Sequence, residues 1–166
     1  MLDEVVRILF VDDDQLVLNA LRRTLRSSPW EVHLCVDSTD ALRMVRDERI
    51  DVVVTDQAMP QLSGVELLSL LAVDHDQVVR VMMTGHGDHD LAMRAINEGN
   101  VFRFVDKPWN DAALNTILTD AATLALRRRQ EDQERRAMLT GRVSVRVRRD
   151  EAQSLFDSDT PRALEK

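Results

Sequence analysis

The sequence has little of three features that define broad classes of protein. Its 166 residues contain a single cysteine, Cys35, so no internal disulfide can form, which is compatible with the reducing cytosol. No apolar run approaches the roughly 20 residues that cross a bilayer. Asp3 and Glu4 lie where a signal peptide would be basic, and there is no fixed repeat or low-complexity tract. We therefore expect a cytoplasmic protein that does not associate with a membrane.

The charge is unevenly distributed along the chain. The formal net charge is −7, yet residues 127–150 contain nine arginines against four acidic residues. The change from an acidic body to a basic tail indicates a boundary. The composition is 44% hydrophobic, which is enough for a sizeable core. We expect one domain over residues 1–126, followed over residues 127–166 by a basic helical extension and a partly disordered tail.

Short apolar segments alternate with segments of helical spacing. The predicted strands cover residues 5–11, 31–36, 51–55, 78–84 and 101–105. The predicted helices cover residues 16–25, 38–47, 64–73 and 88–98, and a fifth begins at Asn110 or Asp111. Nearly continuous apolar strands that alternate with helices favour a parallel sheet covered on both faces, with right-handed crossovers. The expected fold is therefore of the α/β class.

Several residues are expected to define the helix ends. Ser38 or Thr39 can cap the second helix, and Asp88 can cap the fourth. Gly99 is expected to end the fourth helix. Asp14 is expected to cap the first helix.

Polar residues follow four of the predicted strands. Asp12 and Asp13 end the first strand, Asp56 the third, Thr84 the fourth and Lys107 the fifth. Because the carboxyl ends of parallel strands meet at one edge of a sheet, we expect these side chains to converge. Clustered carboxylates repel one another, so at least one would resist ionisation without a counter-charge.

A hard divalent cation would supply this counter-charge. Mg²⁺ prefers oxygen ligands and usually keeps several waters beside one or two protein carboxylates. Asp13 and Asp56 are the expected direct ligands, together with the backbone carbonyl of Ala58. Asp12 is expected to contribute through a water molecule. The sequence therefore predicts a magnesium site.

Four motifs at these positions occur together. They are ILFVDDD, DVVVTDQAMPQLSGVELL, VMMTG and FRFVDKPW. In this order and spacing, over about residues 5–126, the chain resembles the receiver domain of bacterial two-component response regulators. The resemblance implies a flavodoxin-like sheet in the order 2-1-3-4-5. The segment INEGNVFRFVDKPW is similar to a subgroup often fused to HD-GYP phosphodiesterases or other signalling outputs.

The resemblance also implies roles for individual residues. Asp56 matches the phosphoacceptor, which receives a phosphoryl group from a histidine kinase or a phosphotransfer protein. Asp12 and Asp13 match the acidic pair, and Lys107 matches the lysine that accompanies them. Beyond assisting its own phosphorylation and dephosphorylation, the protein is not expected to be an enzyme. The fused output domain or output protein is not identified by the sequence.

A conformational switch follows from the same resemblance. Thr84 matches the hydroxyl that responds to the phosphoryl group, and Phe104 matches the aromatic residue that rotates on activation. Pro108 matches a proline that is cis in relatives, which would aim Lys107 inward. We expect the face formed by the fourth helix, fifth strand and fifth helix to change, and the same face could form a homodimer.

Two other functions remain open. A haloacid-dehalogenase-type phosphatase also uses an aspartate after its first strand with Mg²⁺, but the sequence after Asp14 lacks that family's turn. The arginine-rich tail could contact nucleic acid. In this tail the helix is expected to end at Gly141, and residues 143–147 alternate like an isolated strand. His86, Asp88, His89 and Asp90 form either a solvated loop or a second metal site.

Overall fold

The computed structural model describes residues 5–98 and 100–157, with side chains described up to Gly141. The chain divides into two compact units, residues 1–128 and residues 129–166. The first unit contains the sheet, its covering helices and the candidate site. Among the described helices, none is both long enough and apolar enough to cross a membrane.

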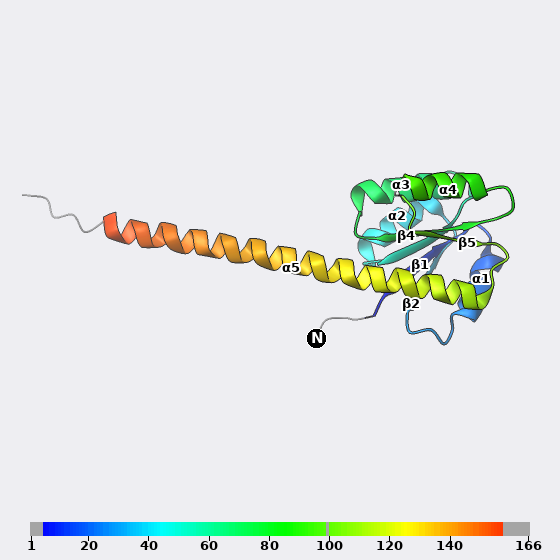
Figure 1. Cartoon of the computed structure of the whole chain (residues 1–166), viewed down its shortest axis with the longest axis horizontal. Coiled ribbons are helices and arrows are strands. Elements are labelled where there is room, and N and C mark those ends of the chain that lie inside the picture. The colour runs from blue at the N-terminus through cyan, green and yellow to red at the C-terminus, as the bar shows by residue number, and fades with distance from the viewer. Residues whose placement is uncertain (1–4, 99, 158–166) are drawn as a thin grey trace, which may run out of the picture. The chain divides into compact units, whose positions relative to one another are not determined.

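A parallel sheet forms the centre of the first unit (Figure 1). Its strands are β1 (Arg7–Val11), β2 (Glu31–Cys35), β3 (Val52–Asp56), β4 (Val79–Thr84) and β5 (Arg103–Asp106). They lie in the order β2-β1-β3-β4-β5, and each neighbouring pair is parallel. The expected flavodoxin-like strand order is therefore confirmed.

Helices cover both faces of this sheet. They are α1 (Gln15–Thr24), α2 (Ser38–Asp47), α3 (Gly64–Asp74), α4 (His89–Asn97) and α5 (Asp111–Asp157). Buried residues of α1 and of the first turns of α5 pack in one hydrophobic cluster, and buried residues of α2, α3 and α4 pack in the other. The expected α/β class with helices on both faces is confirmed.

The alternation of side chains along the strands explains why the strand sequences are nearly continuously apolar. Successive residues of a strand point to opposite faces. In β1, Ile8 and Phe10 belong to the cluster under α1 and α5, whereas Leu9 and Val11 belong to the cluster under α2, α3 and α4. Because both faces are buried, neither set can be polar.

The start of α1 agrees with the sequence prediction, and the start of α2 differs from it. Asp14 caps α1 as expected, since its carboxylate accepts a hydrogen bond from the Leu16 amide at 2.8 Å. The α2 cap is Asp37, not Ser38 or Thr39. Its carboxylate lies one residue earlier in extended backbone and accepts from the amides of Thr39 and Asp40, which a hydroxyl inside the helix cannot do.

The start of α4 also departs from the prediction. Asp88 occupies the N-cap position, but its side chain makes no capping hydrogen bond. Its backbone is already in the helical region, where a cap side chain does not reach the following amides. Gly99, the expected end of this helix, lies outside the described residues.

The end of α5 was predicted wrongly. The helix does not stop at Gly141, and residues 143–147 are helical rather than a strand. A lone strand leaves its backbone groups unpaired, whereas a helix pairs them internally. One glycine costs a helix only about 1 kcal/mol, and the arginine, alanine, methionine and leucine residues shortly before Gly141 are good helix formers. Asn110 caps the start, accepting from the Ala113 amide at 3.0 Å.

Candidate functional site

The predicted site residues converge at one edge of the sheet. Asp12 directly follows β1, and Asp56 and Thr84 are the last residues of β3 and β4. Lys107 follows β5, and its amide donates to the Thr84 carbonyl at 2.7 Å. The parallel register sets these strand ends side by side, with Asp56 opposite Met83 on the neighbouring strand. The convergence predicted from the sequence is observed.

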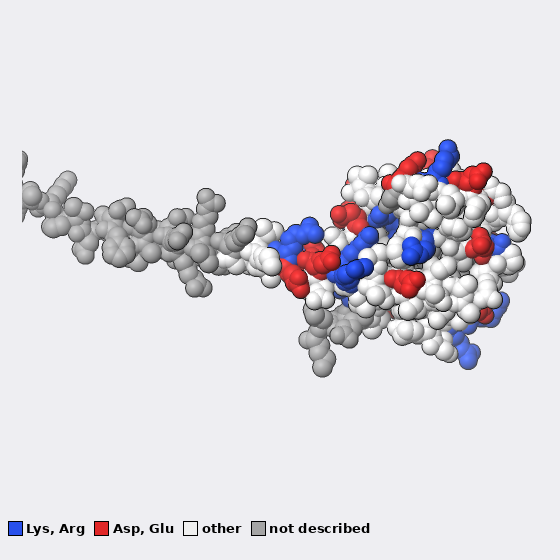
Figure 2. Space-filling model, viewed as in Figure 1, with Lys and Arg blue, Asp and Glu red and all other residues white. Residues whose placement is uncertain are grey.

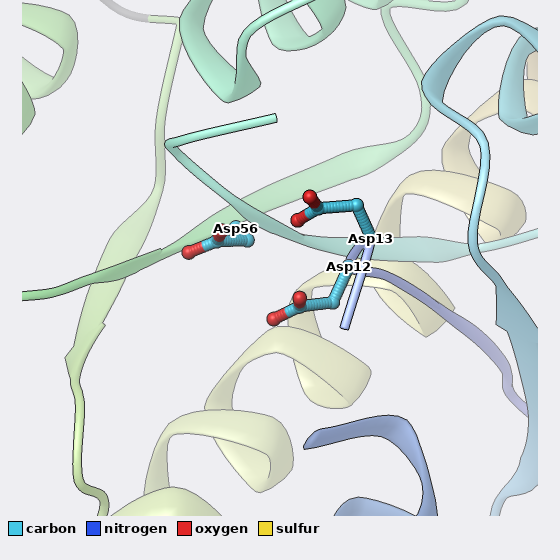
Figure 3. Close-up of side chains that lie close together, drawn as sticks. All are labelled: Asp12, Asp13 and Asp56. Atoms are coloured by element: carbon cyan, nitrogen blue, oxygen red, sulfur yellow. The ribbon is translucent and has the colours of Figure 1, made fainter. Parts of the chain in front are cut away.

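Three carboxylates form a cluster at this edge. One oxygen from each of Asp12, Asp13 and Asp56 lies within 4.8 Å of the others. Figure 3 shows the three side chains extending from the ends of β1 and β3 toward a common space. Asp12 and Asp56 are buried, with 2% and 8% of their surface exposed, whereas Asp13 is exposed. The cluster is therefore open to solvent on the side of Asp13.

The Lys107 ammonium joins this cluster from a distant part of the sequence. Its Nζ donates to Asp12 Oδ2 at 2.6 Å and to Asp56 Oδ1 at 2.9 Å. The peptide bond between Lys107 and Pro108 is cis. One ammonium against three carboxylates leaves two negative charges when all four groups are ionised.

Burial and pairing act in opposite directions on the acidic and basic groups. Burial raises the pKa of the Asp56 carboxyl above its usual value, although the hydrogen bond from Lys107 opposes this and the charge of Asp12 adds to it. Burial also acts to lower the pKa of the Lys107 ammonium, but its bonds to Asp12 and Asp56 outweigh burial and the pKa is raised. The ammonium is therefore held charged, whereas the pKa of Asp56 stays raised because burial outweighs the effect of Lys107.

These residues fit a divalent cation of the hard type. The donors are carboxylate oxygens, and the two uncompensated charges equal the charge of such a cation. Asp12 is oriented by a further bond, since its Oδ1 accepts from the Asp14 amide at 2.9 Å. Asp13 carries a carboxylate on the open side of the cluster. The three carboxylates thus provide the kind of oxygen ligands that Mg²⁺ prefers.

Thr84 lies beside this cluster with an unused hydroxyl. The residue is 1% exposed, and within the described part of the chain its Oγ1 has no hydrogen-bond partner. It lines a hollow of about 370 Å³. The other residues of that wall are Gly85, His86, Gly87, His89, Asp106, Lys107 and Pro108. A buried, unpaired hydroxyl next to a hollow is available to a group that enters there.

Phe104 contacts a residue that the sequence did not connect with it. The half-buried Phe104 ring packs edge to face with His89, the first residue of α4, with ring centroids 5.1 Å apart. This contact bridges β5 and α4. The second metal site considered around His86 is not formed, because within the described residues the one group of three or more potential metal ligands is Asp12, Asp13 and Asp56.

Gly64 is a site residue that sequence reasoning missed. A Cβ atom at this position would lie 2.3 Å from the carbonyl oxygen of Asp56. The start of α3 therefore approaches the backbone of the cluster so closely that only glycine fits. The sequence signal was a glycine eight residues after Asp56, directly following a serine suited to helix capping.

Comparisons with known proteins agree with this geometry. The family model described as "Response regulator receiver domain" matches residues 8–119. The phosphoglycerate transport system transcriptional regulatory protein PgtA of Salmonella typhimurium is 32% identical over 121 residues, which are 73% of this chain and 29% of PgtA. The response regulator MprA of Mycobacterium ulcerans is 33% identical over 129 residues, which are 78% of this chain and 54% of MprA.

Solved structures show the same fold. A structure described as the adenylate cyclase of Rhodopirellula baltica has a TM-score of 0.74 and 30% identity, covering 80% of this chain and 98% of that one. The signal receiver domain of an HD domain-containing protein from Pseudomonas fluorescens has a TM-score of 0.69 and 31% identity, covering 73% and 97%.

The chain covers only part of its curated relatives, from 24% of the hydrogenase regulator HoxA of Cupriavidus necator to 54% of MprA. The match to the receiver model nevertheless covers more than half of this chain and includes the five described strands, apart from Arg7 of β1, and all the clustered side chains. The protein belongs to the response regulator receiver domain family of two-component systems.

Proposed function

We propose that Asp56 accepts a phosphoryl group from a phosphohistidine on a sensor histidine kinase or a phosphotransfer protein. A carboxylate oxygen of Asp56 forms the new O–P bond as the N–P bond of the donor breaks, and the proton needed by the leaving imidazole comes from solvent. The observation that carries this proposal is the approach of Lys107 Nζ to both Asp12 and Asp56. An aspartate is a suitable nucleophile for this transfer.

In this proposal the cluster binds Mg²⁺. Asp13 and Asp56 would be direct ligands, Asp12 a ligand through water, and the Ala58 carbonyl a further direct ligand. The cation would neutralise charge that spreads over the phosphoryl oxygens. Lys107 would contact a phosphoryl oxygen from the other side, because its ammonium already donates to Asp56.

Thr84 and Phe104 form the proposed switch. A phosphoryl group on Asp56 offers an acceptor to the unpaired Thr84 hydroxyl, which would draw the loop after β4 inward. Shifting a population from 1:99 to 99:1 needs about 5.5 kcal/mol. Two or three hydrogen bonds to charged groups, at about 1.5–3 kcal/mol each, are of this size. Phe104 would then leave His89, and the face formed by α4, β5 and the start of α5 would change.

The output of this switch lies in a partner or a further domain. The curated relatives PgtA and HoxA are named as transcriptional regulators, and HoxA of Bradyrhizobium diazoefficiens matches 92% of this chain at 31% identity. We propose that residues beyond 128 connect the receiver to an output of that kind. Separately, the α4–β5–α5 face could bind a second copy of the chain. The cytoplasmic location and the HD-GYP-associated subgroup stay predictions.

Nucleic-acid contact through the arginine-rich segment also stays a prediction. Arg128 donates to the carbonyls of Asp76 and Val78, and Arg136 pairs with Asp132, so these two arginines are engaged within the protein. In Figure 2 the basic and acidic side chains of the visible, described surface alternate and do not gather in one basic patch. The family match supports a receiver, and contact of the arginine-rich segment with nucleic acid would be an addition to that role.

Intact mass spectrometry tests the acceptor role. We expect the wild-type chain to gain the mass of one phosphoryl group when incubated with a small-molecule phosphodonor and Mg²⁺. Asp56→Asn should gain none, and Asp51→Asn should behave as wild type, because Asp51 lies at the opposite end of β3 and accepts from the Arg7 amide. Equal labelling of wild type and Asp56→Asn would refute the assignment.

A further inference from the structure

Among the contacts that hold the turn between β3 and α3, two involve buried polar side chains, Gln57 and Ser38. At its base, the Gly64 amide donates to the Gln57 carbonyl and the Val65 amide donates to Gln57 Oε1, both at 3.0 Å. At its outer part, the Leu62 amide donates to Ser38 Oγ at 3.2 Å, and Ser38 Oγ donates to the Pro60 carbonyl at 3.3 Å. The turn is thus closed on itself by Gln57 and attached to α2 by the buried Ser38, beside which the exposed Thr39 Oγ1 donates to Gln61 Oε1 at 3.4 Å.

Burial distinguishes these two anchors from the turn that they hold. Ser38 is 3% exposed and Gln57 is 8% exposed, whereas Ala58 and Pro60 are exposed. Met59, next to Ala58, packs against the cluster under α2, α3 and α4, whereas residues 60–62 are held through α2. The buried Ser38 hydroxyl donates one hydrogen bond to this turn and accepts another from it. The position of residues 60–62 is therefore tied to the position of α2.

Ala58 lies between the two anchors. It is two residues from Asp56, which the sheet holds in register with Met83, and two residues from Pro60, which Ser38 holds. We propose that Ser38 is a positioning residue for the cation: it fixes the turn whose Ala58 carbonyl completes the ligand set, and thereby favours Mg²⁺ over Ca²⁺. This inference rests on the proposed magnesium site.

The selectivity follows from the different demands of the two cations. Mg²⁺ needs nearly octahedral oxygen ligands at about 2.0–2.1 Å, whereas Ca²⁺ accepts six to eight ligands at about 2.3–2.6 Å in flexible geometry. A carbonyl held in one place suits the first requirement. A turn that moves costs Mg²⁺ an aligned ligand but lets Ca²⁺ adjust, so loosening the turn should affect the two cations unequally.

Calorimetric titration of the full, unphosphorylated chain with Mg²⁺ alone and with Ca²⁺ alone tests this inference. Ser38→Ala removes both hydroxyl bonds to the turn. We expect its dissociation constant for Mg²⁺ to rise about three- to tenfold, the equivalent of one lost hydrogen bond, and its dissociation constant for Ca²⁺ to change less than about twofold because that ion adapts. Ser69→Ala is the matched control, since its hydroxyl lies on α3 and contacts Asn100 instead of the turn.

A second variant covers the case in which Ser38→Ala does not fold. Gln57→Met keeps the length of the side chain but removes the Oε1 acceptor at the base of the turn, and it should weaken Mg²⁺ binding with the same preference. An unchanged Mg²⁺ affinity in a folded variant, or an equal loss for both cations, would overturn the role of Ser38. If instead the wild-type chain bound no Mg²⁺ or gained no phosphoryl mass, the proposed function itself would fail.

Discussion

Replacing Asp56 with asparagine should stabilise the metal-free protein, although it removes an ion pair. At an effective dielectric constant of about 20, two like charges 4.8 Å apart, the upper limit within the cluster, repel by about 3.5 kcal/mol. The attraction between Lys107 Nζ and Asp56 Oδ1 at 2.9 Å is about 5.7 kcal/mol on the same scale. Among the charged neighbours of Asp56, Lys107 outweighs Asp12 in its effect on the pKa, and the charge of the exposed Asp13 is screened by solvent, so charge alone favours the carboxylate.

Relief of burial acts against the loss of the Lys107 attraction and outweighs it. Burial is the largest cause of the raised pKa of Asp56, so a neutral amide is cheaper to bury than the carboxylate. We expect a net gain of about 1–3 kcal/mol in the free energy of unfolding at pH 7, which raises the melting temperature by about 4–12 °C for a unit of this size.

The pH dependence gives this prediction a sign that can be checked. Since the folded-state pKa of Asp56 is raised, the folded protein binds the proton more tightly than the unfolded chain does. The carboxylate therefore destabilises the fold increasingly as the pH rises above the ordinary aspartate pKa of about 3.9. The gap between wild type and Asp56→Asn should be largest at neutral pH and close as the pH falls toward that value.

Urea denaturation followed by tryptophan fluorescence, with and without Mg²⁺, is the appropriate assay. A ligand at 100 times its dissociation constant stabilises a fold by about 2.7 kcal/mol. Mg²⁺ should stabilise wild type by about this amount and Asp56→Asn much less. The difference in the free energy of unfolding between the two proteins should therefore narrow or reverse when Mg²⁺ is added. A variant that is less stable than wild type at pH 7 without metal, or a gap that widens toward acid, would refute the reasoning.

Three further substitutions probe other contacts. Gly64→Ala should lower the free energy of unfolding by about 1–3 kcal/mol through overpacking, while Gly141→Ala, with open space around it, should not lower stability in the same denaturation experiment. Thr84→Val should leave the unphosphorylated protein equally or more stable, by up to about 1 kcal/mol, because the threonine hydroxyl is buried without a partner among the described residues. Mass spectrometry should still show phosphorylation. If α4 responded to phosphorylation as it does in wild type, the proposed switch would be wrong. His89→Ala should remove an aromatic contact of about 0.5–1.5 kcal/mol and change the NMR signals of the Phe104 ring, and an unaltered ring spectrum would contradict this.

The sheet and the convergence of the charged side chains could be predicted because they depend on local patterns. A strand buried on both faces is apolar throughout, and parallel strands end at a common edge, so Asp12, Asp56 and Lys107 had to meet. The sequence could not show that Ser38 holds the turn after β3, because that bond joins residues 22 and 24 positions apart.

The errors at helix ends have a related cause. Ser38 looks like a cap because serine is a frequent cap residue, but its hydroxyl is committed to the β3–α3 turn and Asp37 takes the amides. Gly141 looks like a stop because glycine is common at helix ends. A glycine stops a helix only where the following chain gains by leaving it, and after Gly141 a lone strand would leave backbone groups unpaired that the helix pairs.

The placement of a carboxylate at the end of a fully buried strand produces two opposing effects on one group. Burial keeps Asp56 fixed and strengthens its interactions with Lys107, but it also favours the neutral form, which is a poor nucleophile. The ammonium alone does not remove this conflict, since the pKa of Asp56 stays raised beside it. A cation bound in the acidic cluster would add positive charge beside Asp56 and lower this pKa, which favours the nucleophilic carboxylate.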